Sequence, residues 1–342
     1  MDRNARIFVA GGSTLIGAAL LRLLASQSYT NVVGMPPGEP NLCSAPEVDS
    51  FFSRFRPEYV LFAAGKSGGI EANRLFPADL IIDNLLSECH VIDAAHRHGV
   101  KKLLYVGSSC SYPKHCPQPM RVESLMSGPL EPTNDAYATA KIAGIKLCQA
   151  YARQHADNFI SGIPANAFGI DDDFSPDGGH VVPALIGKFH KAKVQSQPSV
   201  SIWGTGTPRR EFIFADDLAD ACLFVMREYD DAQTPINLGS GEDLSIRETA
   251  ELIRDVVGYP GELIFDATKP DGMPLKSLDS SPLIRLGWRP NTPIVKALMK
   301  TYEAYLRPRA AEAETDRGWG ISNARRVPLS PWGRGVRGEG GG

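Results

Sequence analysis

Short apolar runs rich in β-branched and aromatic residues alternate with longer segments of helical period in the first half of the chain. The runs cover residues 6–10, 31–34, 59–64, 103–109 and 159–163, and the helical segments between them include 15–26, 47–55, 77–98 and 135–155. Such alternation is typical of repeated strand–helix–strand units. We therefore predict an α/β fold with a doubly wound parallel sheet that carries helices on both faces.

A glycine-rich loop joins the first run to the first helical segment and consists of Gly11, Gly12, Ser13, Thr14, Leu15, Ile16 and Gly17. A strand that feeds a glycine turn and a helix N-terminus gathers free N–H groups where a pyrophosphate can bind. Thr14 stands where the spacing G-x-x-G-x-x-G requires glycine, which Thr tolerates if its backbone conformation is ordinary. We expect a Rossmann-type dinucleotide site, with a ligand-free turn as the alternative.

The choice between NAD and NADP usually depends on an acid or an arginine at the end of the second strand. Residues 34–39 hold neither type in the usual place, so the sequence leaves this choice open.

After Gly169 the alternation loosens into a loop, 171–179, followed by apolar runs at 199–203 and 210–214 and helical segments from His180 and Asp216. We predict a dinucleotide-binding domain over 1–169, to which some later segments return, and a smaller α/β substrate domain over 170–310. Residues 311–342 contain eight glycines and five arginines and should form a disordered tail. Nucleic-acid binding by this tail is the alternative, against which its acidic residues argue.

Composition excludes several classes of protein. The formal charge of −3 gives no basic excess for nucleic acid. No apolar run approaches the ~18 residues of a membrane helix, and the apolar stretch near the N-terminus is too short for a signal peptide. The six cysteines show no CxxC spacing. We expect a cytoplasmic protein with reduced thiols and no metal site.

Tyr137 and Lys141 are four residues apart in a predicted helix and should share one face of it. A lysine cation beside a tyrosine lowers the phenol pKa by favouring phenolate. Ser108 and Ser109 end the fourth apolar run, at the edge where such sheets bind ligands, so a serine hydroxyl there can bond a substrate carbonyl. The Tyr–Lys spacing alone is common in surface helices, but these features together favour a catalytic site.

Longer segments carry a resemblance to a known family. They are residues 107–114, 130–148, 180–185, 203–212 and 269–272. In them the chain resembles the extended short-chain dehydrogenase/reductase superfamily and, within it, the GDP-L-fucose synthases. That family epimerises GDP-4-dehydro-6-deoxy-D-mannose at C3 and C5 and reduces it at C4. The resemblance spans most of residues 5–305.

The resemblance implies a role for each matching residue. Tyr137 would protonate the C4 oxygen as hydride arrives from NADP(H), Lys141 would hold down the tyrosine pKa and bind the nicotinamide ribose, and Ser108 would polarise the carbonyl. Cys110 would act as base and His180 as acid in the epimerisation. The resemblance also implies that Pro164, Asn166 and His180 contact the cofactor. The residues that it implies as contacts to the GDP-sugar are Lys188, Trp203, Arg210 and Asp271. It further implies that the protein is a homodimer.

Several positions depart from the family. Gly12, Ser13 and Met35 stand where relatives carry residues that favour NADPH, so NAD(H) is not excluded. Residues 164–170, PANAFGI, lack the Tyr and Pro that the relatives have in a Leu-Tyr-Gly-Pro segment here. Another deoxysugar substrate and a non-catalytic cofactor-binding protein therefore stay as alternatives. For Cys110 the alternative role is a buried small hydrophobe, for His180 a capping or surface residue, and for Trp203 a core residue.

Overall fold

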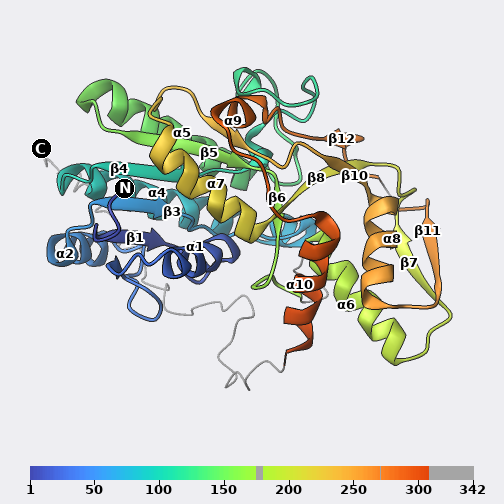
Figure 1. Cartoon of the computed structure of the whole chain (residues 1–342). Coiled ribbons are helices and arrows are strands. Elements are labelled where there is room, and N and C mark those ends of the chain that lie inside the picture. Colours follow the sequence, from blue (N-terminus) through green and yellow to red (C-terminus); the bar gives the residue numbers. More distant parts are fainter. Residues whose placement is uncertain (175–179, 270, 308–342) are drawn as a thin grey trace, which may run out of the picture. The chain divides into compact units, whose positions relative to one another are not determined.

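Six parallel strands form the central sheet in the order β2-β1-β3-β4-β5-β9 (Figure 1). Their bounds are Val32–Val33, Ile7–Ala10, Tyr59–Phe62, Lys102–Val106, Phe159–Pro164 and Ile236–Leu238, in that order. The computed structural model describes residues 1–174, 180–269 and 271–307, and Met1–Leu306 form one compact unit. The predicted doubly wound parallel sheet is confirmed. The predicted tail, 311–342, lies outside the described residues.

Helices cover both faces of the sheet (Figure 1). Helix α1 (Leu15–Ser26) packs against α7 (Ala215–Glu228), while α4 (Pro77–Arg97) packs against α2 (Ala45–Phe55) and α5 (Asp135–His155). Helix α3 (Ile70–Leu75) precedes α4. The bounds of α1 and α5 coincide with those that the sequence predicts.

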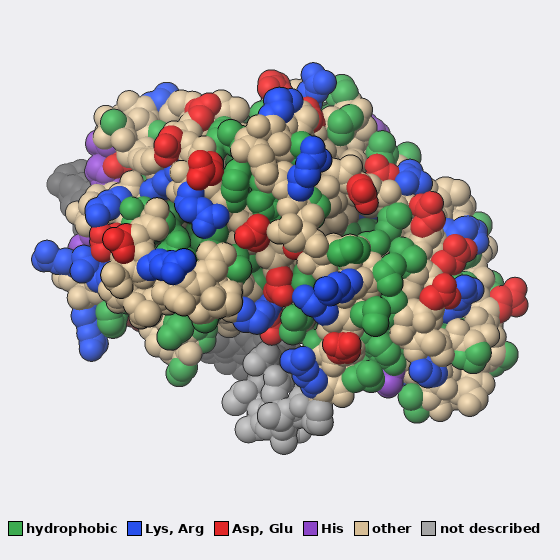
Figure 2. Space-filling view, in the orientation of Figure 1, with side chains coloured by type: hydrophobic (Ala, Val, Ile, Leu, Met, Phe, Trp, Pro, Cys, Tyr) green, Lys and Arg blue, Asp and Glu red, His purple; other side chains and the backbone are tan. Residues whose placement is uncertain are grey.

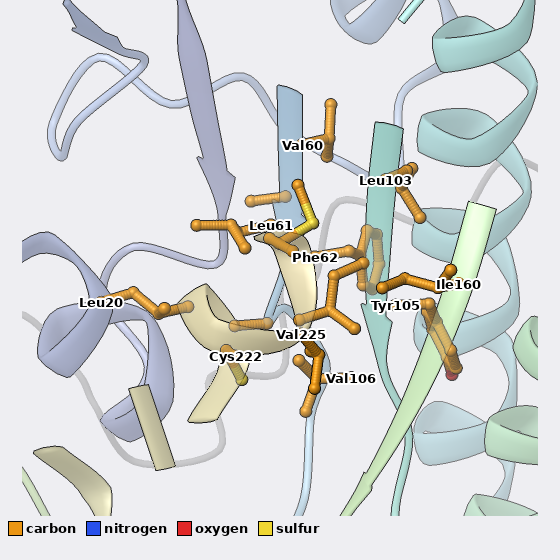
Figure 3. Close-up of a cluster of buried hydrophobic side chains, with 14 of the residues drawn as sticks. Leu20, Val60, Leu61, Phe62, Leu103, Tyr105, Val106, Ile160, Cys222 and Val225 are labelled. Atoms are coloured by element: carbon orange, nitrogen blue, oxygen red, sulfur yellow. The ribbon is translucent and has the colours of Figure 1, made fainter. Parts of the chain in front are cut away.

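The core of the sheet is a cluster of buried side chains from adjacent strands and from α7 (Figure 3). Phe62 and Tyr105 come from β3 and β4, and their ring centroids lie 5.5 Å apart on the face that α4 and α5 cover, while Ile160 from β5 and Val225 from α7 belong to the same buried cluster. All four have no exposed surface. A parallel sheet covered on both faces needs such continuous apolar strands, which is why the runs in the sequence are apolar rather than alternating.

A second, mixed sheet is built around β8 (Arg209–Phe214). Strands β6 (Asn166–Phe168) and β12 (Leu275–Lys276) pair with it in parallel, and β10 (Asp243–Ser245) pairs antiparallel. Strand β7 (Ser199–Trp203) pairs with β11 (Glu262–Asp266). The remaining elements are α6 (Val181–Val194), α8 (Ile246–Val257), α9 (Ser281–Leu286), α10 (Ile294–Leu306) and the short helices η1 (Ser109–Ser111) and η2 (Val122–Ser124).

A separate buried cluster underlies this part of the chain and includes Phe168, Phe189, Phe214 and Ile253. By contrast, α7 and β9 contribute to the cluster of the central sheet. The division of the chain near Gly169 into two domains stays a prediction.

Two features of the structure relate to nucleic-acid binding and to membrane spanning. Basic and acidic side chains are interspersed over the face drawn in Figure 2. Among the helices of the described residues, none is both long and apolar enough to cross a membrane.

Candidate active site

The candidate site lies at the carboxyl ends of the parallel strands. The strand order reverses at β1, which has β2 on one side and β3 on the other. Open sheets of this kind bind ligands in the crevice outside such a reversal. The glycine loop, the Ser108 turn after β4 and the segment after β5 all start from this edge.

The glycine loop closes tightly between β1 and α1. Gly11 has φ +85°, and a Cβ there would lie 2.5 Å from backbone atoms of Ala64. A Cβ on Gly17 would lie 1.9 Å from the carbonyl oxygen of Gly11. Thr14 begins the helix with φ −76° and ψ 163°. Its hydroxyl accepts the N–H of Gly17 at 3.0 Å and donates to the carbonyl of Gly11 at 2.8 Å. The threonine therefore fits the loop through an ordinary backbone conformation.

The start of α1 offers donors to an anion. The first N–H groups of a helix have no intrahelical acceptor. Gly17 gives its N–H to Thr14 Oγ1 and Ala18 gives its N–H to the Thr14 carbonyl. This leaves the N–H groups of Leu15 and Ile16 at the positive end of the helix dipole, where a pyrophosphate can bind. The loop therefore fits a dinucleotide.

Replacing Gly17 with alanine should destabilise this loop. The added methyl group would overlap the Gly11 carbonyl, and relieving the overlap must separate the loop from the helix, at a cost of about 3 kcal/mol. Thermal unfolding should show a lower melting temperature and weaker dinucleotide binding. Gly128→Ala is the matched control, because a Cβ there meets Pro113 at an ordinary 3.4 Å. An unchanged melting temperature for Gly17→Ala would contradict the geometry of the loop.

Glu39 reaches the same loop from the segment after β2, and sequence reasoning missed it. Its carboxylate accepts the backbone N–H groups of Gly11 and Gly12. Burial raises the pKa of Glu39, partly offset by these two bonds. The sequence holds no Lys or Arg between Arg22 and Arg54, and Arg22 pairs with Asp171 and Asp216. Residues 34–39, where the adenine ribose of a dinucleotide would lie, thus present the carboxylate of Glu39, and no cation stands between Arg22 and Arg54 to bind a 2′-phosphate.

Tyr137 lies in the first turn of α5 beside the Ser108 turn. The two side chains share a hydrogen bond, and Ser108 Oγ also accepts the N–H of Cys110 at 3.2 Å. The structure therefore brings Ser108, Cys110 and Tyr137 together, as the sequence predicts.

Lys141 is buried under this site with an acidic partner. Its Nζ donates to the carbonyls of Ala64 and Val106 at 3.3 and 3.4 Å. It lies 3.4 Å from Glu88 Oε1, and both side chains are almost fully enclosed. The hydroxyl of Tyr105 also donates to Glu88 at 2.6 Å. Burial lowers the pKa of Lys141 and raises that of Glu88, while their mutual attraction opposes both shifts.

One expectation about Tyr137 needs correction. Instead of being lowered by Lys141, its pKa is raised, mainly by burial and further by the charges of Cys110 and Glu88, against the hydrogen bond from Ser108. Glu88 lies 3.4 Å from the ammonium of Lys141 and partly neutralises it, so the lysine does not offset the effect of burial on Tyr137. A tyrosine with a raised pKa stays protonated, which suits a proton donor.

Cys110, His180 and a lysine that the sequence analysis did not select form a second group. Asn134 Nδ2 lies 3.3 Å and Lys276 Nζ lies 3.5 Å from the sulfur of Cys110. Desolvation lowers the pKa of His180, and the charge of Lys276 lowers it further, against Asp173. His180 precedes α6 without capping it through its side chain, and it is exposed, so the alternative of a surface residue stands beside the catalytic role. Cys110 is half-exposed, so it is not the buried hydrophobe of the alternative interpretation.

The four predicted sugar-nucleotide residues lie around β7 and β8. Trp203 is 71% exposed, which excludes the core role. Lys188 Nζ bonds the Ser201 carbonyl, and Arg210 donates to the Met273 carbonyl at 2.6 Å. Asp271 holds the loop after Trp203 by accepting the N–H and hydroxyl of Thr205 at 2.9 and 2.7 Å. The Nζ of Lys269 lies 5.6 Å from the centre of the exposed Trp203 ring. An exposed indole suits a nucleotide base, and the cations of Lys188 and Arg210 suit a diphosphate.

Two further predicted contacts follow β5. Pro164 ends that strand. Asn166 begins β6, and its Nδ2 donates to the Glu211 carbonyl at 2.8 Å. This bond ties the cofactor edge of the central sheet to β8. Pro164 thus belongs to the central sheet and Asn166 to the second, and the contact of either residue with a cofactor stays a prediction.

Comparison with known proteins agrees with this arrangement. A model of the NAD dependent epimerase/dehydratase family matches residues 7–239. GDP-L-fucose synthase 1 of Arabidopsis thaliana is 50% identical over 306 residues, which cover 90% of this chain and 94% of the relative. The chain therefore belongs to the NAD dependent epimerase/dehydratase family. Within that family it falls among the GDP-L-fucose synthases.

Solved structures share the fold as well. A GDP-mannoheptose C4 reductase from Campylobacter jejuni with NADP bound superposes with a TM-score of 0.82 at 35% identity, covering 89% of this chain and 99% of the other. A GDP-L-fucose synthetase from Naegleria fowleri bound to NADP has a TM-score of 0.82 at 28% identity, covering 90% and 95% of the two chains. The names of both proteins describe enzymes of GDP-sugars.

Proposed function

We propose that this chain is an NADP(H)-dependent GDP-L-fucose synthase that converts GDP-4-dehydro-6-deoxy-D-mannose into GDP-L-fucose. One observation carries the proposal: Cys110 follows Ser108 by two residues and donates its N–H to the Ser108 hydroxyl, and its sulfur lies 3.5 Å from Lys276, whose charge acts on His180. Reduction of a ketone needs the Ser–Tyr–Lys group, and inversion of neighbouring carbons needs the Cys–His group.

Epimerisation comes first. The C4 ketone makes the hydrogens on C3 and C5 acidic, because the electron pair left behind can move onto the ketone oxygen. Cys110 removes a proton from one face, and His180 supplies one to the opposite face. The lowered pKa of His180 makes its imidazolium a stronger acid.

Reduction follows at C4. NADP(H), when bound, supplies the hydride. Ser108 hydrogen-bonds the ketone oxygen and Tyr137 gives that oxygen its proton. The raised pKa of Tyr137 keeps the phenol protonated until then. Lys141 lies one helical turn below, where it can bind the nicotinamide ribose. Trp203, Arg210, Lys188 and Asp271 hold the GDP portion.

Incubation of the protein with GDP-4-dehydro-6-deoxy-D-mannose and NADPH tests the proposal. We expect the absorbance of reduced nicotinamide to fall and chromatography to identify GDP-L-fucose. Oxidation of NADPH that yields a different product sugar would show that the proposed reaction is wrong. Intact protein that binds the cofactor and oxidises none of it would support the non-catalytic alternative.

The ribose side of the loop predicts weak discrimination against NADH. Met35 is 54% exposed there, and Glu39 repels a 2′-phosphate while it can accept a ribose hydroxyl. Met35→Arg should lower the KM for NADPH about tenfold relative to NADH, since one charge-assisted bond to phosphate contributes about 1.5–3 kcal/mol. Parallel titrations with both cofactors measure the ratio. Met35→Gln is the uncharged control, and an equal effect from both variants would contradict the electrostatic argument.

The proposal includes a homodimer in the cytoplasm. The homodimer is carried over from the resemblance, and light scattering of the purified chain measures it. All six cysteines are free, which suits a reducing compartment.

A further inference from the structure

Lys276 has no role in the predicted chemistry, yet its side chain contacts Cys110 and its charge acts on His180, the two residues predicted for the epimerisation. It belongs to the two-residue strand β12, whose pairing with β8 places it opposite Arg210. Its Nζ lies 3.5 Å from Cys110 Sγ, and its charge acts on His180. The structure therefore brings a residue of the second sheet to the Ser108 turn of the first.

The charge of Lys276 is not neutralised by a carboxylate within the part of the chain that the structure describes, since no acid lies within salt-bridge distance of it there. Arg210, its neighbour in register, directs its guanidinium to the carbonyls of Arg209 and Met273 instead of the sulfur. The ammonium thus acts on Cys110 at close range.

The other groups that act on or respond to the sulfur are Asn134 and Tyr137. Asn134 donates an N–H to it, which favours a negatively charged sulfur, while Tyr137 is protonated and neutral. His180 faces Lys276 and is itself acted on by Asp173. Two donors, one of them cationic, therefore converge on a thiol that has to lose its proton before it can act as a base.

We propose that Lys276 is a positioning residue of the epimerisation, holding Cys110 as a thiolate ready to take a proton from the sugar. This inference rests on the proposed function in one respect, the role of Cys110 as base. In the step itself a C–H bond of the sugar breaks, an S–H bond forms at Cys110, and the electron pair moves to the ketone oxygen. His180 then loses its proton to the carbon from the other face, and the thiol proton returns to the imidazole through solvent. Lys276 keeps its protons throughout.

Alkylation of cysteines by iodoacetamide tests the proposal without substrate or cofactor, because only the thiolate reacts. Peptide mass spectrometry follows Cys110 separately from Cys43, Cys89 and Cys116. Lys276→Met should slow the alkylation of Cys110 at neutral pH about tenfold, since a cation 3.5 Å from the sulfur typically has that effect or more. Lys276→Arg should restore most of the rate.

The control variant is Lys101→Met, which removes a cation that pairs with Glu58 on the surface. It should leave Cys110 unchanged. An unchanged rate in Lys276→Met, or a rate in Lys276→Arg as low as in Lys276→Met, would overturn the proposal.

A variant that fails to fold would show altered alkylation of all the cysteines. The unaltered chain then decides: at neutral pH its Cys110 should be alkylated faster than the exposed Cys89, and an equal or slower rate would overturn the proposal. If Cys110 behaves as expected but the chain does not turn over the GDP-sugar, the proposed function fails and the effect of Lys276 on the thiol stands.

Discussion

Tyr137→Phe should reduce the rate of C4 reduction by about 10²–10⁴-fold while leaving the KM for the GDP-sugar close to its original value. The size of the loss is that of a general acid removed from the transition state. The phenylalanine ring fills the same half-buried space, so binding and folding should persist. Ser108 loses one hydrogen-bond partner but keeps the N–H of Cys110. The oxidation of NADPH in the presence of the GDP-sugar measures the effect.

The same variant should still exchange hydrogen at C3 and C5 with deuterated water, because Cys110 and His180 are intact. Tyr151→Phe provides the matched control: Tyr151 lies on the same helix and bonds Asp93 away from the site, at 2.9 Å. Retained reduction in Tyr137→Phe would remove Tyr137 from the mechanism, and an equal loss in Tyr151→Phe would indicate damage to α5.

Cys110→Ser has the second largest expected effect. A serine hydroxyl is a far weaker acid than a thiol, so it cannot supply the anionic base, and epimerisation should fall by about 10²–10⁴-fold. The reduction residues stay in place, so NADPH should still be consumed slowly and yield a sugar that is not inverted at C3 and C5. Nuclear magnetic resonance of the product and of deuterium uptake measures both effects.

Cys116→Ser is the control for this experiment. Cys116 lies six residues further along and is also half-exposed, and the proposed mechanism does not use it. Formation of GDP-L-fucose at the original rate by Cys110→Ser would contradict the assigned role of the thiol.

The central sheet was predictable because each of its strands is a local apolar run and each crossover is a helix with a clear period. Helix α5, for example, begins at Asp135 and ends at His155 as predicted. The second sheet could not be predicted, since its strands β6, β10 and β12 contain only two or three residues each. Their pairing with β8 depends on long-range contacts that no local pattern indicates.

The candidate site also has a part that the sequence predicts and a part that it does not. Ser108, Cys110 and Tyr137 follow from motifs at the end of β4 and the start of α5, and the structure brings them together. Lys276 could not be found, because it reaches Cys110 only through β12 pairing with β8. Glu39 could not be found either, since the segment after β2 has to fold back before its carboxylate reaches Gly11.

Deuterium labelling of the product tests the central claim, that one site first inverts C3 and C5 and then reduces C4. The reaction is run in deuterated water with GDP-4-dehydro-6-deoxy-D-mannose and unlabelled NADPH, and the product is examined by mass spectrometry and nuclear magnetic resonance. The account predicts GDP-L-fucose with deuterium on C3 and C5 and ordinary hydrogen on C4. A reduced sugar that carries no deuterium on C3 or C5 would contradict it.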